Sequence, residues 1–198
     1  ESEIVALVSS NEEVEAIGAG EEGIIIVKES PFYAEMGGQS GDKGKITTKN
    51  GKAKVVDTKK NGDDVYFHIV SVEEGSISKG DIASLSVCKK NRMSICRNHS
   101  TTHLLHKALK EVLGSHVAQA GSYVDESRMR FDFSHFEAMT TDEIKQVEAI
   151  VNNYILSAIE VIVREMPIKE AQKLGAMALF GEKYGEVVRV ESFYLDRQ

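Results

Sequence analysis

The residues best suited to chemistry are three histidines within one short segment, His99, His103 and His106. Each residue of an α-helix advances by about 100°, so the three imidazoles would share one stripe of a helix surface. The leucines of the segment fall on the other side, and we expect all three histidines to face away from the core. Histidines four residues apart can hold one zinc ion. The pair alone is a weak motif, because solvated surface histidines show the same spacing and zinc needs further ligands.

Three other polar side chains could serve such a site. Gln39 ends a Gly-Gly-Gln tripeptide, which hydrolyses the peptidyl-tRNA ester in peptide-release factors. The glycines around it favour a simpler role, a turn in which Gln39 hydrogen-bonds backbone. Thr102 lies at the edge of the histidine stripe and could present its hydroxyl to the same cleft. Gln119 interrupts an otherwise apolar strand, so it either faces solvent or hydrogen-bonds a substrate.

Composition places the chain among ordinary globular proteins. With 198 residues, 41% apolar and 28% charged, it can hold one large domain or two small ones. No apolar run approaches the length of about 20 residues that spans a bilayer, so we expect no membrane association. The N-terminus lacks both a signal peptide and a methionine, which indicates a piece of a larger protein.

Charge and cysteines narrow the class further. The net charge of −7 argues mildly against nucleic acid, yet lysines gather between Lys43 and Lys60, where they form either a phosphate-binding stripe or a solvated surface. The two cysteines, Cys88 and Cys96, are too few for a disulfide framework, which favours a cytoplasmic protein. Cys96 stands close to His99 as a candidate ligand, but its apolar neighbour favours a buried packing role.

The first half reads as short strands. The β-branched run Glu22–Val27 predicts a buried strand. Asn50-Gly51 and Asn61-Gly62 predict hairpin turns between further short strands. Regularly spaced short strands suggest a small closed β-barrel over residues 1–90.

The sequence pattern changes after Asn91, from short strands to a mixture of helices and strands. Residues 91–198 are predicted to form a separate α+β domain with helices on one face of an antiparallel sheet. The histidine helix should run from Asn98, a suitable N-cap, to Leu113. Two paired strands follow, and Thr140 to Glu143 match a capping box that opens a long helix. A short helix after Pro167 should end at Gly175. The predicted fold class is therefore α+β, with a small N-terminal β-barrel before the α+β domain.

Five stretches together resemble the editing region of the alanyl-tRNA synthetase family, in order and from about Val5 to Phe193. They are Pro31 to Asp42, Arg97 to His106, Gln119 to Ser122, Arg130 to His135 and Ala178 to Gly185. One departure is Met36, where the family usually has serine before the two glycines.

The resemblance implies a zinc-dependent hydrolase that cleaves the ester of tRNA(Ala) mischarged with serine or glycine. In the family, a His-x-x-x-His pair and a later Cys-x-x-x-His pair hold the zinc. His99 and His103 match the first pair, His106 matches no ligand, and Thr102 and Gln119 match residues associated with substrate recognition. The second pair is absent before Gln198, so we expect half a metal site and weak zinc binding. ATP and Mg²⁺ would serve only an upstream part of the full protein.

Three alternatives stay open. The first is a free-standing editing hydrolase of the same family. The second is the related editing domain of threonyl-tRNA synthetase, which shares the zinc motif but lacks the barrel with its Gly-Gly-Gln stretch. The third is a non-catalytic RNA-binding module, whose binding would fall steeply with salt and survive loss of both histidines. Zinc could bind the substrate amine or activate a water, and the sequence leaves the choice between them, and the oligomeric state, open.

Overall fold

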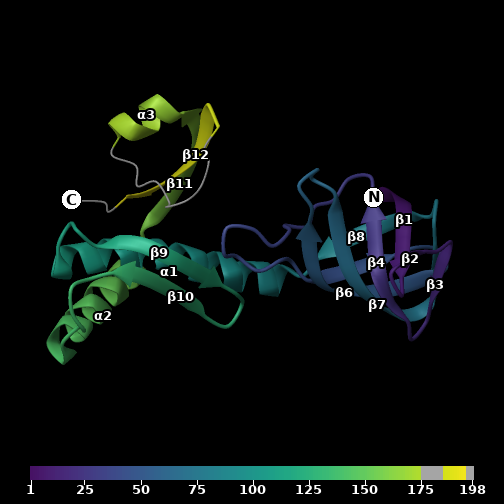
Figure 1. Ribbon diagram of the computed structural model, residues 1–198, viewed down its shortest axis with the longest axis horizontal. Coiled ribbons are helices and arrows are strands. Elements are labelled where there is room, and N and C mark those ends of the chain that lie inside the picture. Colours follow the sequence, from purple (N-terminus) through teal and green to yellow (C-terminus); the bar gives the residue numbers. More distant parts are fainter. Residues whose placement is uncertain (175–184, 195–198) are drawn as a thin grey trace. The chain divides into compact units, whose positions relative to one another are not determined.

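The computed structural model describes residues 1–174 and 185–194, which form two units (Figure 1). The first unit comprises residues 1–99 and 123–129, and the second comprises residues 100–122 and those from 130 onward. The boundary falls inside α1 (Lys89–Leu113), a single unbroken helix. Among the described residues, no helix is long and apolar enough to cross a membrane.

The first unit is built on one eight-stranded antiparallel sheet. Its strands are β1 (Ser2–Ser9), β2 (Glu12–Glu13), β3 (Ala16–Gly18), β4 (Glu22–Val27), β5 (Gly44–Thr47), β6 (Gly51–Lys60), β7 (Tyr66–Ser78) and β8 (Ile82–Val87). The order is β2-β1-β4-β7-β6-β5-β8, and β3 pairs with β7. Strand β8 also pairs with β1, so the pairings among β1, β4, β7, β6, β5 and β8 form a ring, to which β2 is added beside β1.

Alternation of side chains explains how these strands form a core. Along the start of β6, Ala53 and Val55 are buried while Lys52 and Lys54 are exposed, the period of two that a strand with one buried face requires. Buried aliphatic residues from most of the strands pack together. Both Asn-Gly predictions are confirmed, because β5 and β6 pair across the first and β6 and β7 across the second.

The second unit contains the rest of α1 and a mixture of short elements. They are β9 (Ala118–Val124), β10 (Met129–Ser134), α2 (Thr141–Leu156), β11 (Glu160–Pro167), α3 (Ile168–Lys173) and β12 (Val187–Tyr194). β9 pairs with β10, and β11 with β12. Leu109 of α1, Val117 and Val147 of α2 share one apolar cluster. The mixed fold, with one large antiparallel sheet and few helices, agrees with the predicted class in outline.

The predicted N-terminal end is correct for α2 and wrong for α1. The capping box at Thr140 is present, with the side chains of Thr140 and Glu143 each bonded to the other's backbone. However, α1 begins at Lys89, so Asn98 is not an N-cap. No glycine or proline separates Lys89 from Asn98, and the helix therefore continues through that segment. The Asn98 side chain instead donates to the carbonyl of Asp125, at 2.9 Å.

Two smaller expectations concern Cys96 and Gly175. Cys96 is exposed, so the prediction that it packs in the core is wrong; its neighbour Ile95 is the buried residue. Consecutive helix residues point about 100° apart, and only one of the two can face the core. The predicted end of the last helix at Gly175 lies outside the described residues.

Candidate metal site

Three potential metal ligands meet beside α1. His99, His103 and Glu191 of β12 each offer one ligand atom, and these atoms all lie within 4.8 Å of one another. The spacing of the two histidines is set by one turn of a continuous helix. Two imidazoles and one carboxylate form a ligand set that zinc uses in catalytic sites, with a fourth position for water or substrate. The residues present therefore fit a zinc ion.

Glu191 is the potential ligand that the sequence did not reveal. It stands far from the histidines in the chain, and no local motif marks it. Its side chain is 21% exposed and also pairs with Arg189, at 3.1 Å. A carboxylate within a short predicted strand was the only available signal, and it is a weak one. His103 lies against another side chain of β12, since its ring centroid is 5.9 Å from that of Phe193.

The Gly-Gly-Gln stretch forms a tight turn beside His99. Met36 and Gln39 exchange two backbone hydrogen bonds, of 3.2 and 3.0 Å. Between them Gly37 and Gly38 have φ of 59° and 76°, the positive values that a type I′ turn requires at both central positions. The predicted glycine turn is thus confirmed. The side chain of Gln39, however, reaches a histidine, because its Oε1 lies 2.9 Å from Nδ1 of His99.

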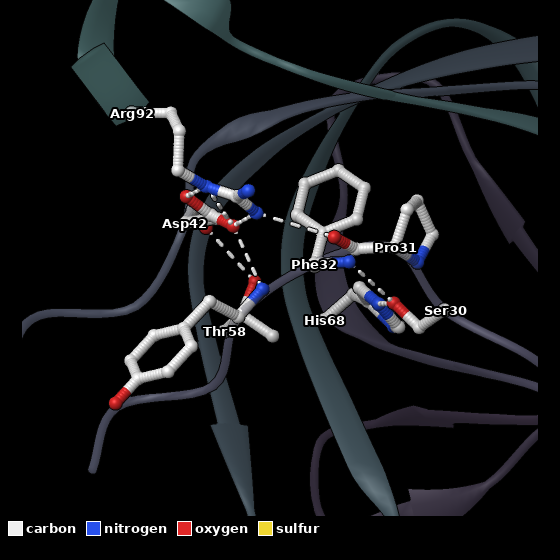
Figure 2. Close-up of polar contacts among 8 residues, drawn as sticks. Ser30, Pro31, Phe32, Asp42, Thr58, His68 and Arg92 are labelled. Atoms are coloured by element: carbon white, nitrogen blue, oxygen red, sulfur yellow. Dashed lines mark hydrogen bonds and ion pairs between the residues drawn. The ribbon is translucent and has the colours of Figure 1, made fainter. Parts of the chain in front are cut away.

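A buried carboxylate ties the segment that carries this turn to the start of α1 (Figure 2). Asp42 is 2% exposed. Its oxygens accept from Nε of Arg92 at 2.8 and 3.0 Å and from the backbone N–H of Tyr33 at 2.7 Å. The Arg92 guanidinium also contacts Asp42 through Nη2, and this partner raises the pKa of Arg92. Thr58 completes the arrangement by donating its hydroxyl to the Asp42 carbonyl, at 2.8 Å.

The same close-up shows a buried histidine that supports the segment from its other side (Figure 2). Nδ1 of His68 lies 2.8 Å from the carbonyl of Ile25. Because a carbonyl only accepts, Nδ1 donates, and Nε2 accepts from the Ser30 hydroxyl at 2.7 Å. His68 is fully buried, and this burial lowers its pKa. The residue is a neutral structural histidine.

His106 does not face away from the core as predicted. It is only 8% exposed, and its ring centroid lies 5.1 Å from that of Phe131 on β10. Burial, with the nearby charge of Lys110, lowers its pKa. The reason is that α1 is covered on more than the leucine side, since β10 packs over the turn that carries His106. Among the described residues, His106 lies outside the ligand cluster.

The two predicted substrate contacts lie on separate elements. Thr102 stands on α1 between His99 and His103 and is 8% exposed. Gln119 is a half-buried residue of β9, and its amide donates to the hydroxyl of Ser122 at 3.1 Å. This bond joins two residues of the same strand and orients the Gln119 amide, and the roles of both residues stay predictions.

Comparison with known proteins assigns the family. The profile of "tRNA synthetases class II (A)" matches residues 1–91. The alanine–tRNA ligase of Acetivibrio thermocellus is 53% identical over 187 residues, which cover 94% of this chain and 21% of that protein. The ligases of Listeria monocytogenes and Rhodopseudomonas palustris are 51% and 50% identical over 96% and 97% of this chain. The chain belongs to the alanyl-tRNA synthetase family. The resemblance to this family that was found in the sequence is thus confirmed.

The chain aligns with one segment of each of these alanyl-tRNA synthetase relatives. The chain spans about a fifth of their length, 21% of the Acetivibrio protein and 22% of the other two. Both the turn with Gln39 and the helix with His99 and His103 lie inside the stretches that carry the resemblance.

Proposed function

We propose that the chain is the editing region of an alanyl-tRNA synthetase, and that it hydrolyses the ester of tRNA(Ala) mischarged with serine or glycine. The observation that carries the proposal is the ligand cluster of His99, His103 and Glu191 in a chain of this family. We propose zinc as the metal, because two imidazoles and one carboxylate are typical zinc ligands.

A separate hydrolytic site has a physical reason. Serine differs from alanine by one hydroxyl, and glycine by one missing methyl. A pocket shaped for a methyl group rejects either of them by no more than about 10²-fold. A second site that hydrogen-bonds a hydroxyl can remove the serine error. Thr102 and Gln119 are the residues that we assign to this recognition.

The residues of this chain would have distinct roles at the metal. His99 and His103 hold the metal, and Glu191 supplies the third ligand. Bound zinc polarises a carbonyl or lowers the pKa of a bound water. Half-burial of the three ligands limits the access of bulk water, which strengthens their electrostatic interaction with a metal ion.

We also infer an arrangement of functional domains. The ring of strand pairings in the first unit supports the small closed barrel expected over residues 1–90, and residues 91–198 would carry the hydrolytic site. The partner would be tRNA(Ala), in the cytoplasm. ATP and Mg²⁺ would serve aminoacylation elsewhere in the full protein. A free-standing editing hydrolase would carry the same site, and the gene sequence on either side of these residues distinguishes it.

The rival function is a non-catalytic RNA-binding module, and the lysine-rich strands are the observation in its favour. Four of the lysines between Lys43 and Lys60 are paired with carboxylates: Lys43 with Glu126, Lys52 with Glu74, Lys59 with Glu35 and Asp57, and Lys60 with Asp64. These pairs neutralise part of the stripe that phosphates would need. The metal cluster therefore supports the editing function better than the lysines support the rival.

The test is metal dependence of hydrolysis in the full-length protein that the gene encodes. His99→Ala combined with His103→Ala should remove bound zinc and lower the hydrolysis of Ser-tRNA(Ala) by at least about 10²-fold, the usual scale for losing a group that acts in the transition state. His116→Ala is the control, because His116 is an exposed histidine outside the cluster. Unchanged hydrolysis in the zinc-free double variant would overturn the proposal. RNA binding that survives in that variant without any hydrolysis by the wild type would favour the rival.

A further inference from the structure

The side chain of Gln39 points at the ring nitrogen of a proposed metal ligand. Its Oε1 lies 2.9 Å from Nδ1 of His99, within the range of a good hydrogen bond. We propose that Gln39 is a positioning residue for the metal centre: it fixes the tautomer and the ring orientation of His99 so that Nε2 presents its lone pair to the metal. This inference rests on the proposed function, because it gives Gln39 a role only if His99 binds a metal.

The chemistry follows from what an amide oxygen can do. A carbonyl oxygen accepts hydrogen bonds and never donates, so Nδ1 of His99 must carry the ring proton. A neutral imidazole has one proton, and the lone pair is then on Nε2. Metal-binding histidines commonly donate their other N–H to an acceptor, which raises the basicity of the ligating nitrogen and sets the ring angle. An amide turned the other way would place a donor against Nδ1 and favour the opposite tautomer.

The backbone of the turn holds Gln39, which carries the acceptor Oε1, in a fixed position. The positive φ values of Gly37 and Gly38 are costly for other residues, so the pair holds the turn in one shape. The turn is also anchored to β9, where Ser40 N–H donates to the carbonyl of Val124 at 2.9 Å and Val124 N–H donates to that of Gly38 at 2.8 Å. With the backbone of Gln39 held on both sides, only its side-chain torsions remain to be ordered.

A purely structural role for this bond is the competing explanation, and other contacts make it unnecessary. The same part of the first unit is already joined by Asp42 to Arg92 and by Lys43 to Glu126 at 2.5 Å. The buried ion pair stabilises the fold more than one half-exposed neutral hydrogen bond does. Loss of the Gln39 side chain should therefore change metal affinity much more than stability.

Zinc titration of this chain against a chromophoric chelator tests the inference. Gln39→Leu removes the acceptor and should weaken zinc binding by about 10- to 100-fold, the effect typical of losing such a partner. Gln39→Glu keeps an acceptor and should bind zinc within about threefold of the wild type or more tightly. Met36→Ala is the matched control, because Met36 belongs to the same turn and its side chain is 52% exposed.

A second readout needs no metal. In ¹⁵N NMR spectra of the zinc-free chain, His99 should be in the Nδ1–H tautomer in the wild type and in Gln39→Glu, and should become a mixture of tautomers in Gln39→Leu. Thermal unfolding of each variant separates a loss of folding from a loss of positioning. Equal zinc affinity of Gln39→Leu and the wild type would overturn the inference, as would a wild-type His99 in the Nε2–H form. Failure of the proposed metal centre looks different, because the wild type itself would then bind no zinc.

Discussion

Replacing Asp42 by asparagine should destabilise the first unit by about 2–3 kcal/mol. The Asp42 side chain is 2% exposed and accepts from both Arg92 and the Tyr33 backbone. Asparagine has one acceptor oxygen, so one of these donors loses its partner. A charge-assisted hydrogen bond contributes about 1.5–3 kcal/mol, and removing one member of a fully buried pair costs about 3–5 kcal/mol. Because the Arg92 side chain is 36% exposed and can turn to water, the loss should fall below the cost for a fully buried pair, at about 2–3 kcal/mol.

Urea unfolding followed by circular dichroism measures the effect. With a slope of about 1–1.5 kcal/mol per molar urea for a unit of this size, the midpoint should fall by about 1.5–3 M. The control is Glu126→Gln, whose partner Lys43 is 42% exposed and which should cost less than about 1 kcal/mol. In a cycle with Arg92→Leu, the second substitution should add little once the first is made. A loss below about 0.5 kcal/mol for Asp42→Asn, or full additivity in the cycle, would refute the reasoning.

Three further predictions address pH, the turn and the third ligand. Burial lowers the pKa of His68, so below the unfolded value of about 6.5 the unfolded chain takes up a proton that the folded chain excludes. Stability of the first unit should then be complete above that pH and fall by up to about 1.4 kcal/mol per pH unit below it, as urea midpoints between pH 5 and 8 would show; a flat profile that His68→Gln does not alter would contradict this. Gly38→Ala places a side chain at a φ of 76° and should cost about 1–3 kcal/mol in the same assay, whereas a neutral change would show that the turn is not strained. Glu191→Gln should weaken zinc binding by at least about tenfold, since even about 1.4 kcal/mol of lost metal–ligand bond gives that factor, and Glu165→Gln on the exposed side of β11 should not change it.

Local chemistry explains which parts of the fold could be read from the sequence. The hairpins at Asn50-Gly51 and Asn61-Gly62, the glycine turn before Gln39 and the capping box at Thr140 depend on residues within a few positions of one another. Short stretches of sequence determine such features. The start of α1 was missed because nothing between Lys89 and Asn98 stops a helix, and a plausible N-cap residue can equally stand inside one.

Only part of the candidate metal site could be predicted from the sequence. The spacing of His99 and His103 follows from helix geometry, so the pair could be identified in advance. Glu191 and the contact between Gln39 and His99 depend on how distant segments meet, and no local pattern encodes that. The burial of His106 has the same origin, because a helical wheel shows which residues share a face but not how many faces are covered.

The rate of Ser-tRNA(Ala) hydrolysis relative to that of Ala-tRNA(Ala), measured on the full-length protein with zinc, tests the central claim most directly. The editing function predicts that the seryl ester is cleaved at least about 10²-fold faster than the alanyl ester, because a site that hydrogen-bonds a hydroxyl discriminates strongly against a substrate that lacks one. Equal rates for the two esters, or no cleavage of either while zinc is bound, would contradict the account.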